Sequence, residues 1–359
     1  MLSLSKLNYW VFGALVATGV LLSSETTVYA TDVGELSATS ADVKTLDDTD
    51  PDYWTAERRF AAEPMTLDKI KGGFVVDESP IVAHARNVAE PVVLADPVGP
   101  ADLHDRSAFS DDKGSVDDTV HYGDVPPTVG RLYMTHEGEE GHCTASVVNN
   151  THRNIIMTAA HCVHGGVGGD WYENFKFYPM YDNGPAPGQR AWGGNRVMAP
   201  HGWIHESKTE ADQAFIELKP SGFRTIVDVV GGNGLIFGGD QARDDVVAWG
   251  YPGQYSYNGK TPYFCEGDTR QGRLIRSYAV LNCDFNGGAS GGPWLVDRED
   301  EGRGYIYAVT AKCGSFNIPM KGECLGDPRV IMAAPNGVYA ESMFEKIETG
   351  DWSSDEYLG

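Results

Sequence analysis

Basic side chains are scarce in this sequence, and the shortage excludes a class of partner. Its 28 lysines and arginines stand against 51 aspartates and glutamates, which gives a formal net charge of −23. Phosphate binding needs a basic surface, so we expect no nucleic-acid partner. The acidity is typical of a protein that stays soluble in an extracellular medium.

Long apolar runs are missing after the first thirty residues. Lys6 is followed by an apolar run at residues 10–22 and then by Val28-Tyr29-Ala30, the arrangement of a secretory signal peptide. The alternative is a membrane anchor, but a run of this length makes about 20 Å of helix, short of a hydrocarbon core of about 30 Å. We therefore expect a signal peptide at residues 1–30 and a secreted, extracellular mature protein without a membrane.

Cysteine is absent from residues 31–125, and this stretch differs in composition from the remainder of the chain. It holds 21 acidic and 8 basic side chains with little sustained periodicity, so we interpret it as an acidic, poorly ordered pro-segment. Residues 126–359 hold 29 acidic and 19 basic side chains, all six cysteines and most of the glycine. These residues should form the folded domain.

The six cysteines favour disulfides over free thiols, because they follow a secretory signal and are even in number. Six cysteines allow fifteen connectivities, which the sequence alone leaves open. His142-Cys143 and His161-Cys162 could instead suggest zinc, but oxidised cysteines cannot bind a metal ion. We expect no metal site.

Short apolar runs alternate with clusters of Gly, Pro, Asn and Asp from Val129 onward, and this spacing predicts an all-β sandwich or barrel. The runs lie at residues 145–148, 154–158, 214–218, 246–249 and 305–311. Only residues 339–349 have apolar side chains at the spacing of one helical face, with Gly350 as a stop. We therefore expect a single helix, at the C-terminal end of the folded domain.

One serine stands among residues with almost no side chains, in the run Gly-Gly-Ala-Ser-Gly-Gly-Pro at residues 287–293. A hydroxyl nucleophile needs such surroundings, because backbone N–H groups must point at the developing oxyanion and the carbonyl must approach closely. Ser290 is therefore a candidate nucleophile. The alternative is an ordinary glycine-rich turn that happens to contain a serine.

A histidine and an aspartate occupy the positions that a serine nucleophile requires of its partners. His161 lies just beyond the apolar run that ends at Thr158, and an imidazole suits proton transfer near neutral pH. The carboxylate that orients this imidazole should lie at the start of an apolar strand, where it is shielded from water. Asp212 does so, whereas its rivals Asp182, Asp170 and Glu210 do not.

The order histidine, aspartate, serine separates enzyme classes. Residues 288–292 also match the G-x-S-x-G elbow of α/β-hydrolases, whose histidine follows the serine. All ten histidines lie before residue 206, which excludes that class. The subtilisin order, aspartate before histidine before serine, is not excluded by order alone, but no alternation of strands and long helices surrounds these residues.

Three stretches, at residues 158–162, 212–218 and 287–293, resemble the signatures of the trypsin-like or chymotrypsin-like serine proteases. More narrowly, residues 129–132, 143–148 and 283–288 resemble the secreted microbial glutamyl-endopeptidase-like (V8-like) branch. The resemblance covers about residues 129–345. It implies two packed antiparallel β-barrels, at about 126–225 and 226–340, a C-terminal helix at about 339–349, and an active site in the cleft between the barrels.

The resemblance also implies a role for each site residue. Ser290 would attack the scissile carbonyl, His161 would take its proton and return it to the leaving amine, and Asp212 would orient His161. The N–H groups of Gly288 and Ser290 would form the oxyanion hole. This chemistry needs no metal or organic cofactor, its substrates are proteins or peptides, and we expect a monomer.

Ala289 is a departure from the family pattern. Vertebrate digestive members have an aspartate there, which pairs with the new N-terminal amine after activation. Without that carboxylate the insertion mechanism should not operate. Removal of residues 31–125 from this zymogen would instead uncover the cleft or release a folding aid.

Disulfide pairings follow from the resemblance and from proximity. The histidine-loop disulfide of the family implies a bond between Cys143 and Cys162. Proximity in sequence favours two further bonds, Cys265–Cys283 and Cys313–Cys324.

The specificity pocket can be read in two ways. Asp284 lies six residues before Ser290, the offset at which trypsin-like enzymes place a carboxylate that binds Arg or Lys. Glutamyl endopeptidases bind the substrate carboxylate partly through a histidine after the nucleophile. Thr310, Ala311 and Lys312 occupy that region here, and Lys312 could serve an acidic side chain.

Two other functions stay open. A catalytically silent secreted homologue would act as a binding protein, but such proteins usually lack a triad member and this chain has all three. A secreted esterase using the same triad has little in the sequence for or against it.

Overall fold

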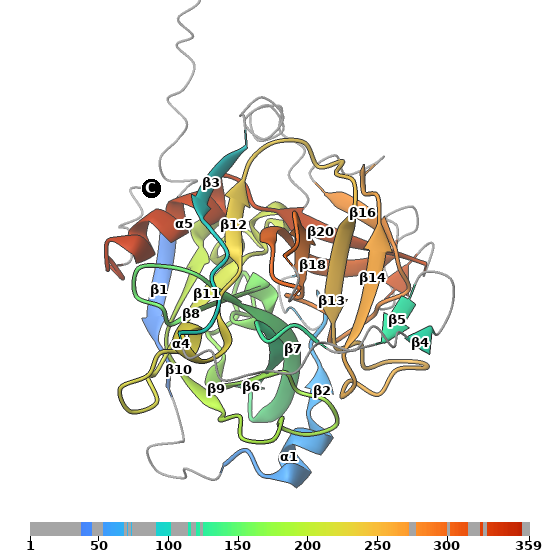
Figure 1. Ribbon diagram of the computed structural model, residues 1–359. Helices are drawn as coiled ribbons and strands as arrows, with labels where there is room; N and C mark the ends of the chain where they lie inside the picture. The colour runs from blue at the N-terminus through green and yellow to red at the C-terminus, as the bar shows by residue number, and fades with distance from the viewer. Residues whose placement is uncertain are drawn as a thin grey trace, which may run out of the picture.

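The computed structural model describes residues 37–44, 53–67, 70, 73, 91–101, 114–115, 120–122, 125–272, 278–299, 302–314, 324–325 and 329–353. The expected signal peptide at residues 1–30 lies outside them. The described strands belong to two curled sheets that stand side by side (Figure 1).

The first sheet contains a closed barrel of six antiparallel strands. They are β6 (Val129–His136), β7 (Glu139–Val148), β8 (Ile155–Thr158), β9 (Glu173–Pro179), β10 (Trp192–Pro200) and β11 (Ala214–Leu218). The ring closes because β10 pairs with β11 on one side and with β9 on the other. Alternate side chains such as Leu132, Phe177 and Ile216 are buried in one apolar cluster inside it, as the period of two in a strand requires.

The second sheet is a curled half-barrel. Its strands include β12 (Gly234–Phe237), β13 (Val246–Gly250), β14 (Tyr263–Gly267), β15 (Arg270–Gln271), β16 (Ala279–Asn282), β17 (Pro293–Val296), β18 (Tyr305–Gly314), β19 (Cys324–Leu325) and β20 (Val330–Pro335). Short helical segments connect some of the strands, among them α3 (His201–Ile204), η4 (Thr209–Ala211) and α4 (Ile226–Val230).

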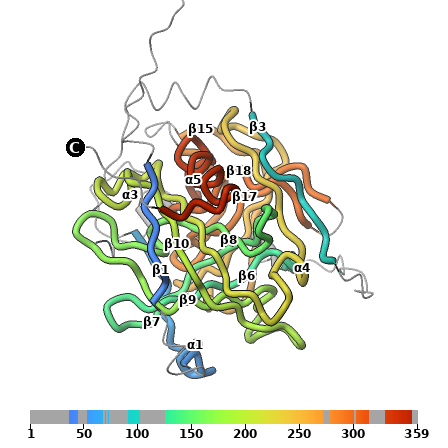
Figure 2. Tube along the Cα trace, turned by 90° about the vertical axis from the view of Figure 1, so that its left-hand side faces the viewer, coloured from blue at the N-terminus to red at the C-terminus, as the bar shows by residue number. Residues whose placement is uncertain are grey.

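Helix α5 (Val338–Glu348) ends the described fold and contacts strands of both sheets. Met343, Phe344 and Ile347 form its buried face, and Figure 2 shows the helix beside β1. The predicted all-β fold with a C-terminal helix is confirmed, and each of the five apolar runs lies in a strand, namely β7, β8, β11, β13 and β18.

The described parts of residues 31–125 differ from the poorly ordered segment that their composition predicts. β1 (Ala38–Asp42) pairs with β10, β2 (Glu63–Pro64) with β7, β3 (Val92–Ala95) with β12, and β5 (Val120–Tyr122) with both β14 and β4 (Gly114–Ser115). The composition of a segment indicates only whether that segment could bury enough apolar surface to fold by itself. These short strands add to existing sheet edges, which supply the hydrogen bonds they need.

Candidate active site

His161 and Asp212 meet because the strands that carry them are neighbours. β8 ends at Thr158, which pairs with Ala214 at the start of β11. His161 lies in the 3₁₀ turn η3 (Ala160–Cys162) just after β8, and Asp212 directly follows η4. Oδ1 of Asp212 accepts the backbone N–H of His161 at 2.8 Å, and Oδ2 lies 2.8 Å from Nδ1 of the imidazole.

This pair fixes the tautomer of His161. Both side chains are fully buried, and an ionised carboxylate can only accept hydrogen bonds. The proton must therefore sit on Nδ1, which leaves the lone pair on Nε2. Nε2 is buried and has no hydrogen-bond partner among the described residues. The imidazole is thus held ready to accept a proton.

Ser290 lies in the turn between β16 and β17, and that turn is bound to both sheets. Its carbonyl accepts the N–H of Thr144 in β7 at 2.9 Å, and the N–H of Gly291 donates to Thr310 in β18 at 2.8 Å. Gly291 has φ +78°, and a Cβ atom there would collide with Oγ1 of Thr158. Glycine therefore lets the serine turn approach the strand that leads to His161.

No hydrogen bond joins Ser290 to His161 in the part of the chain that the structure describes, since Nε2 of His161 lacks a partner there. Such bonds often tighten only when substrate is bound. The structure therefore brings Ser290 and His161 to neighbouring elements, while it joins His161 and Asp212 directly.

The N–H groups of Gly288 and Ser290 are the expected oxyanion donors. Neither the N–H of Gly288 nor that of Ser290 donates to a backbone carbonyl of any described residue. The carbonyl of Gly288 instead accepts Oγ1–H of Thr144 at 2.9 Å. Gly288 has φ +94°, and a Cβ atom there would collide with the ring of His142. Two N–H groups are thus available for an oxyanion.

Two of the disulfides expected from the sequence are present. The Cα atoms of Cys143 and Cys162 lie 6.3 Å apart, and those of Cys265 and Cys283 lie 5.8 Å apart. Cys313 is also disulfide-bonded, and its backbone is in register with that of Cys324. The side chain of Cys324 lies outside the described residues.

The ligand atoms of Cys143, His161 and Cys162 lie within 4.8 Å of one another. The disulfide consumes both thiolates that a zinc ion would need, so this cluster does not fit a metal site.

Comparison with known proteins decides the fold. Residues 143–303 match the family model of the trypsin-like peptidase domain. Among solved structures, the chain is similar to the protease Anisep from Arthrobacter nicotinovorans, with 23% identity and a TM-score of 0.57 over 64% of this chain and 99% of that one. The chain carries a trypsin-like peptidase domain with the chymotrypsin-like fold.

Two further solved structures have this fold. A thermostable serine protease, AL20, from an extremophilic microorganism is 24% identical, with a TM-score of 0.54 over 62% of this chain and 97% of that one. A Glu endopeptidase is 19% identical, with a TM-score of 0.50 over 65% of this chain and 98% of that one. No curated protein matches the sequence. The family match supports a peptidase.

The two candidate specificity residues of the peptidase domain come from different elements. Asp284 follows β16, is partly buried, and accepts the hydroxyl hydrogen of Tyr257. Lys312 lies in β18, and burial lowers its pKa to about 7. Thr310 in the same strand binds Nε1 of Trp294 through its hydroxyl at 2.9 Å.

The sequence analysis missed the part played by Thr144 in the peptidase domain. Besides bonding to the carbonyl of Gly288, its hydroxyl accepts the N–H of Tyr251 at 3.0 Å, while its own backbone N–H binds the carbonyl of Ser290. The stretch that contains Thr144 was informative only as a family resemblance. No local pattern indicates that a threonine in β7 supports a turn far away in the chain.

Replacing Thr144 with valine is expected to lower kcat about tenfold to a hundredfold with little change in KM. Valine keeps the shape but frees the carbonyl of Gly288, and losing a complete oxyanion donor costs about 10²–10³ in kcat. Steady-state kinetics on a peptide substrate measures both constants. Thr144→Ser keeps the hydroxyl and should recover most of kcat; equal losses in the two variants would contradict this role.

Proposed function

We propose that the protein is a secreted serine endopeptidase that works through an acyl-enzyme intermediate, with His161, Asp212 and Ser290 as its catalytic triad. The observation that carries the proposal is the buried His161, which bonds to Asp212 once through its backbone N–H and once through Nδ1 of its imidazole, and whose Nε2 has no hydrogen-bond partner among the described residues. A histidine that served only packing would gain nothing from a buried lone pair without a partner.

The proposed reaction begins when Oγ of Ser290 attacks the carbonyl carbon and its proton moves to Nε2 of His161. The carbonyl oxygen becomes an oxyanion, which the N–H groups of Gly288 and Ser290 stabilise. Nε2–H then protonates the leaving amine, the C–N bond breaks and an ester of Ser290 remains. Water attacks that ester with Nε2 as base, and Ser290 leaves with its proton restored. Asp212 stays ionised and holds the imidazole in place.

Secretion is part of the same proposal. The disulfides of the described residues are typical of oxidising compartments, and residues 1–30 have the layout of a signal peptide. No described helix has the length and apolarity to cross a membrane. We propose that residues 31–125 are a pro-segment and that the peptidase domain is released as a monomer.

Covalent labelling tests the proposed function. The processed protein is treated with a sulfonyl fluoride and analysed by mass spectrometry, which locates both the adduct and the mature N-terminus. We expect a single adduct on Ser290, because only an activated hydroxyl reacts quickly. An adduct elsewhere, or none, would contradict the assignment. Turnover of casein relative to a short-chain nitrophenyl ester separates the peptidase from an esterase, and turnover of neither indicates a binding protein.

A preference for Arg or Lys before the scissile bond is expected if Asp284 forms the floor of the pocket. Because Tyr257 donates to one carboxylate oxygen of Asp284, the other oxygen can bind a substrate cation. A neutral or acidic substrate side chain would leave the negative charge of Asp284 unpaired. We expect Asp284→Ser to lower kcat/KM for an Arg peptide at least about tenfold relative to matched Glu and Phe peptides.

The alternative pocket predicts a different pH profile. Lys312, with a pKa of about 7, would bind a Glu side chain only while it is charged. Hydrolysis of the Glu peptide would then fall as the pH rises through about 7, and Lys312→Met would abolish that dependence. The preference for Arg or Lys is refuted if the Glu peptide has the highest kcat/KM. It is also refuted if Asp284→Ser leaves the order of the Arg, Glu and Phe peptides unchanged.

A further inference from the structure

Residues 53–62 are bound to the first barrel, and we refer to them as the anchor. Thr55 caps helix α1 (Ala56–Ala61) by accepting the N–H of Arg58 at 3.2 Å. Trp54 is buried; its Nε1–H donates to the carbonyl of Asn174 at 2.9 Å, and its ring lies 5.1 Å from that of Tyr133. A large buried aromatic side chain is a typical hot spot of an interface.

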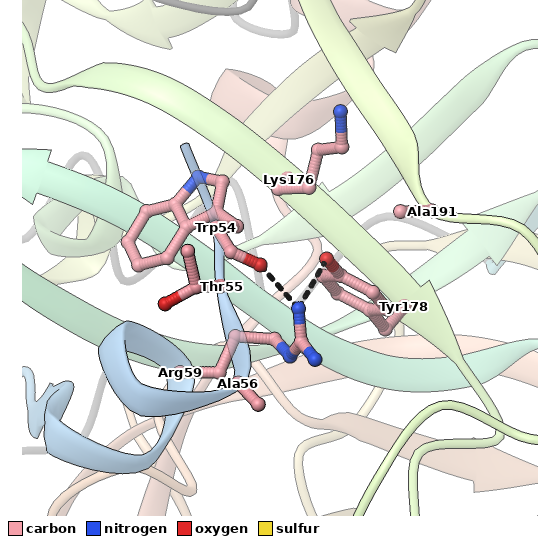
Figure 3. A pocket seen from close by; sticks show the side chains of 7 residues that line it. All are labelled: Trp54, Thr55, Ala56, Arg59, Lys176, Tyr178 and Ala191. Carbon is pink, nitrogen blue, oxygen red and sulfur yellow. Dashed lines mark hydrogen bonds between the residues drawn. The ribbon is translucent and has the colours of Figure 1, made fainter. Parts of the chain in front are cut away.

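Two arginines of the anchor reach barrel residues. Arg59 donates to the hydroxyl of Tyr178 at 3.2 Å and to the carbonyl of Trp54, and Figure 3 shows both bonds beside a pocket that these side chains line. Arg58 forms an ion pair of 3.1 Å with Glu140 in β7. The anchor therefore holds α1 at the end of the barrel where β6 turns into β7.

Residues 63–67 and Ile70, which we call the plug, continue from the anchor along β7. Glu63 and Pro64 form β2, in parallel register with Gly141 and His142. The N–H of Met65 donates to the carbonyl of His142 at 3.0 Å. Met65 is buried, and its Sδ lies 2.8 Å from where a Cβ atom of Gly141 would be. The plug thus follows the strand that leads directly to the first disulfide.

The plug next meets the serine turn. Cγ2 of Thr66 lies 2.6 Å from the position that a Cβ atom would take on Gly287. Gly287 precedes the proposed oxyanion residue Gly288, and Ser290 follows in the same turn. Thr66 is itself buried. Its methyl group therefore packs against the backbone of the serine turn at Gly287.

The plug then reaches the histidine loop. Cγ2 of Ile70 lies 3.0 Å from the position of a Cβ atom on Gly166, shortly after His161. Leu67 and Ile70 are buried in the apolar cluster that contains Ala160 and Cys162, the two neighbours of His161. The described plug residues therefore contact both the serine turn, through Thr66, and the histidine loop, through Ile70.

The active site is closed in this arrangement. His161 is 0% and Ser290 5% exposed to solvent, whereas an attacking hydroxyl must come within about 3–3.5 Å of the substrate carbonyl carbon. We propose that the anchor and the plug act together as an intramolecular inhibitor, in which the anchor docks on the first barrel and the plug, in contact with both the serine turn and the histidine loop, blocks the approach of substrate. The inference rests on the proposed function, since it assigns the regulation of that same site.

Tethering explains how cleavage would relieve the inhibition. In the uncleaved chain the plug binds in an intramolecular step, at an effective concentration set by the connecting residues. Once the chain is cut between the plug and the barrel, that advantage disappears and the plug can diffuse away. No insertion of a new N-terminus beside Ala289 is needed.

The test measures reaction of the uncleaved chain with a fluorophosphonate probe, with intact mass recorded to show that no cleavage has occurred. Trp54→Ala removes the main contact of the anchor and is expected to speed labelling of Ser290 at least about tenfold. Phe223→Ala makes the same kind of change at a fully exposed ring and should leave the rate within about twofold.

A charge-reversal pair covers the case in which Trp54→Ala fails to fold. Arg58 and Glu140 form a partly exposed pair, so Arg58→Glu should fold and speed labelling about twofold to fivefold. The double variant Arg58→Glu/Glu140→Arg restores an ion pair and should return the rate to that of the unaltered chain.

A second readout does not depend on the nucleophile. Diethyl pyrocarbonate modifies accessible neutral imidazoles, and peptide mapping reports modification of His161. Faster modification of His161 in Trp54→Ala supports the plug, even if the fluorophosphonate labels none of the variants. The absence of labelling would contradict only the assignment of the protein as a serine peptidase. Equal rates for the unaltered chain and Trp54→Ala with both reagents overturn the plug, while labelling of Ser290 in every variant would leave the peptidase assignment standing.

Discussion

Replacing Ser290 with alanine in the processed protein is expected to lower casein hydrolysis at least about a thousandfold, because a triad acts as a unit and the loss of one member removes nearly all of its contribution. The release of acid-soluble peptides over time measures the effect. The turn that holds Ser290 is bound through backbone groups of Thr144 and Thr310, so the unfolding temperature should hardly change.

The matched control for this change is Ser221→Ala, since Ser221 lies far along the chain in a surface turn and binds Arg190. It should retain full activity. Casein turnover by Ser290→Ala above about a hundredth of that of the unaltered protein would rule Ser290 out as the nucleophile.

Replacing Asp212 with asparagine is expected to lower kcat by about 10³–10⁴ with little effect on KM. Two N–H groups of His161 point at the two carboxylate oxygens, and asparagine offers only one oxygen together with an NH₂ group. Either the amide faces Nδ1–H donor to donor, or the imidazole takes the other tautomer. The second outcome puts a proton on Nε2, which then cannot accept the proton of Ser290.

Single-turnover kinetics on a peptide ester separates this chemical loss from a change in binding. Asp240→Asn is the control, because Asp240 is exposed and its carboxylate binds only the nearby N–H of Ala242 in the described structure. If Asp212→Asn keeps more than about a tenth of kcat, the role given to Asp212 is wrong.

The pair formed by His161 and Asp212 could be predicted from sequence because local patterns place both residues. His161 follows an apolar run and Asp212 precedes another, and those runs prove to be antiparallel neighbours with Thr158 opposite Ala214. Short apolar runs also located five strands of the two sheets. Such features depend on a few consecutive residues, which a sequence displays directly.

The support for the serine turn could not be predicted in the same way. Thr144 matters because of one backbone carbonyl, that of Gly288, which only the folded turn presents to it. The order within residues 31–125 was also hidden, since the plug and β1 have no periodicity that would indicate structure alone. Met65 and Ala38 are buried by the barrel to which they add, and composition carries no information about that partner.

The pairing of β1 with β10 has a consequence for handling the processed protein. β1 covers the backbone of β10 from Arg196 to Pro200 in antiparallel register. An uncovered strand edge offers N–H and C=O groups to any other extended chain and is a common start of aggregation. Residues 38–42 therefore protect this edge in the uncleaved chain, and a processed protein without residues 31–125 would present the uncovered edge of β10 to neighbouring molecules.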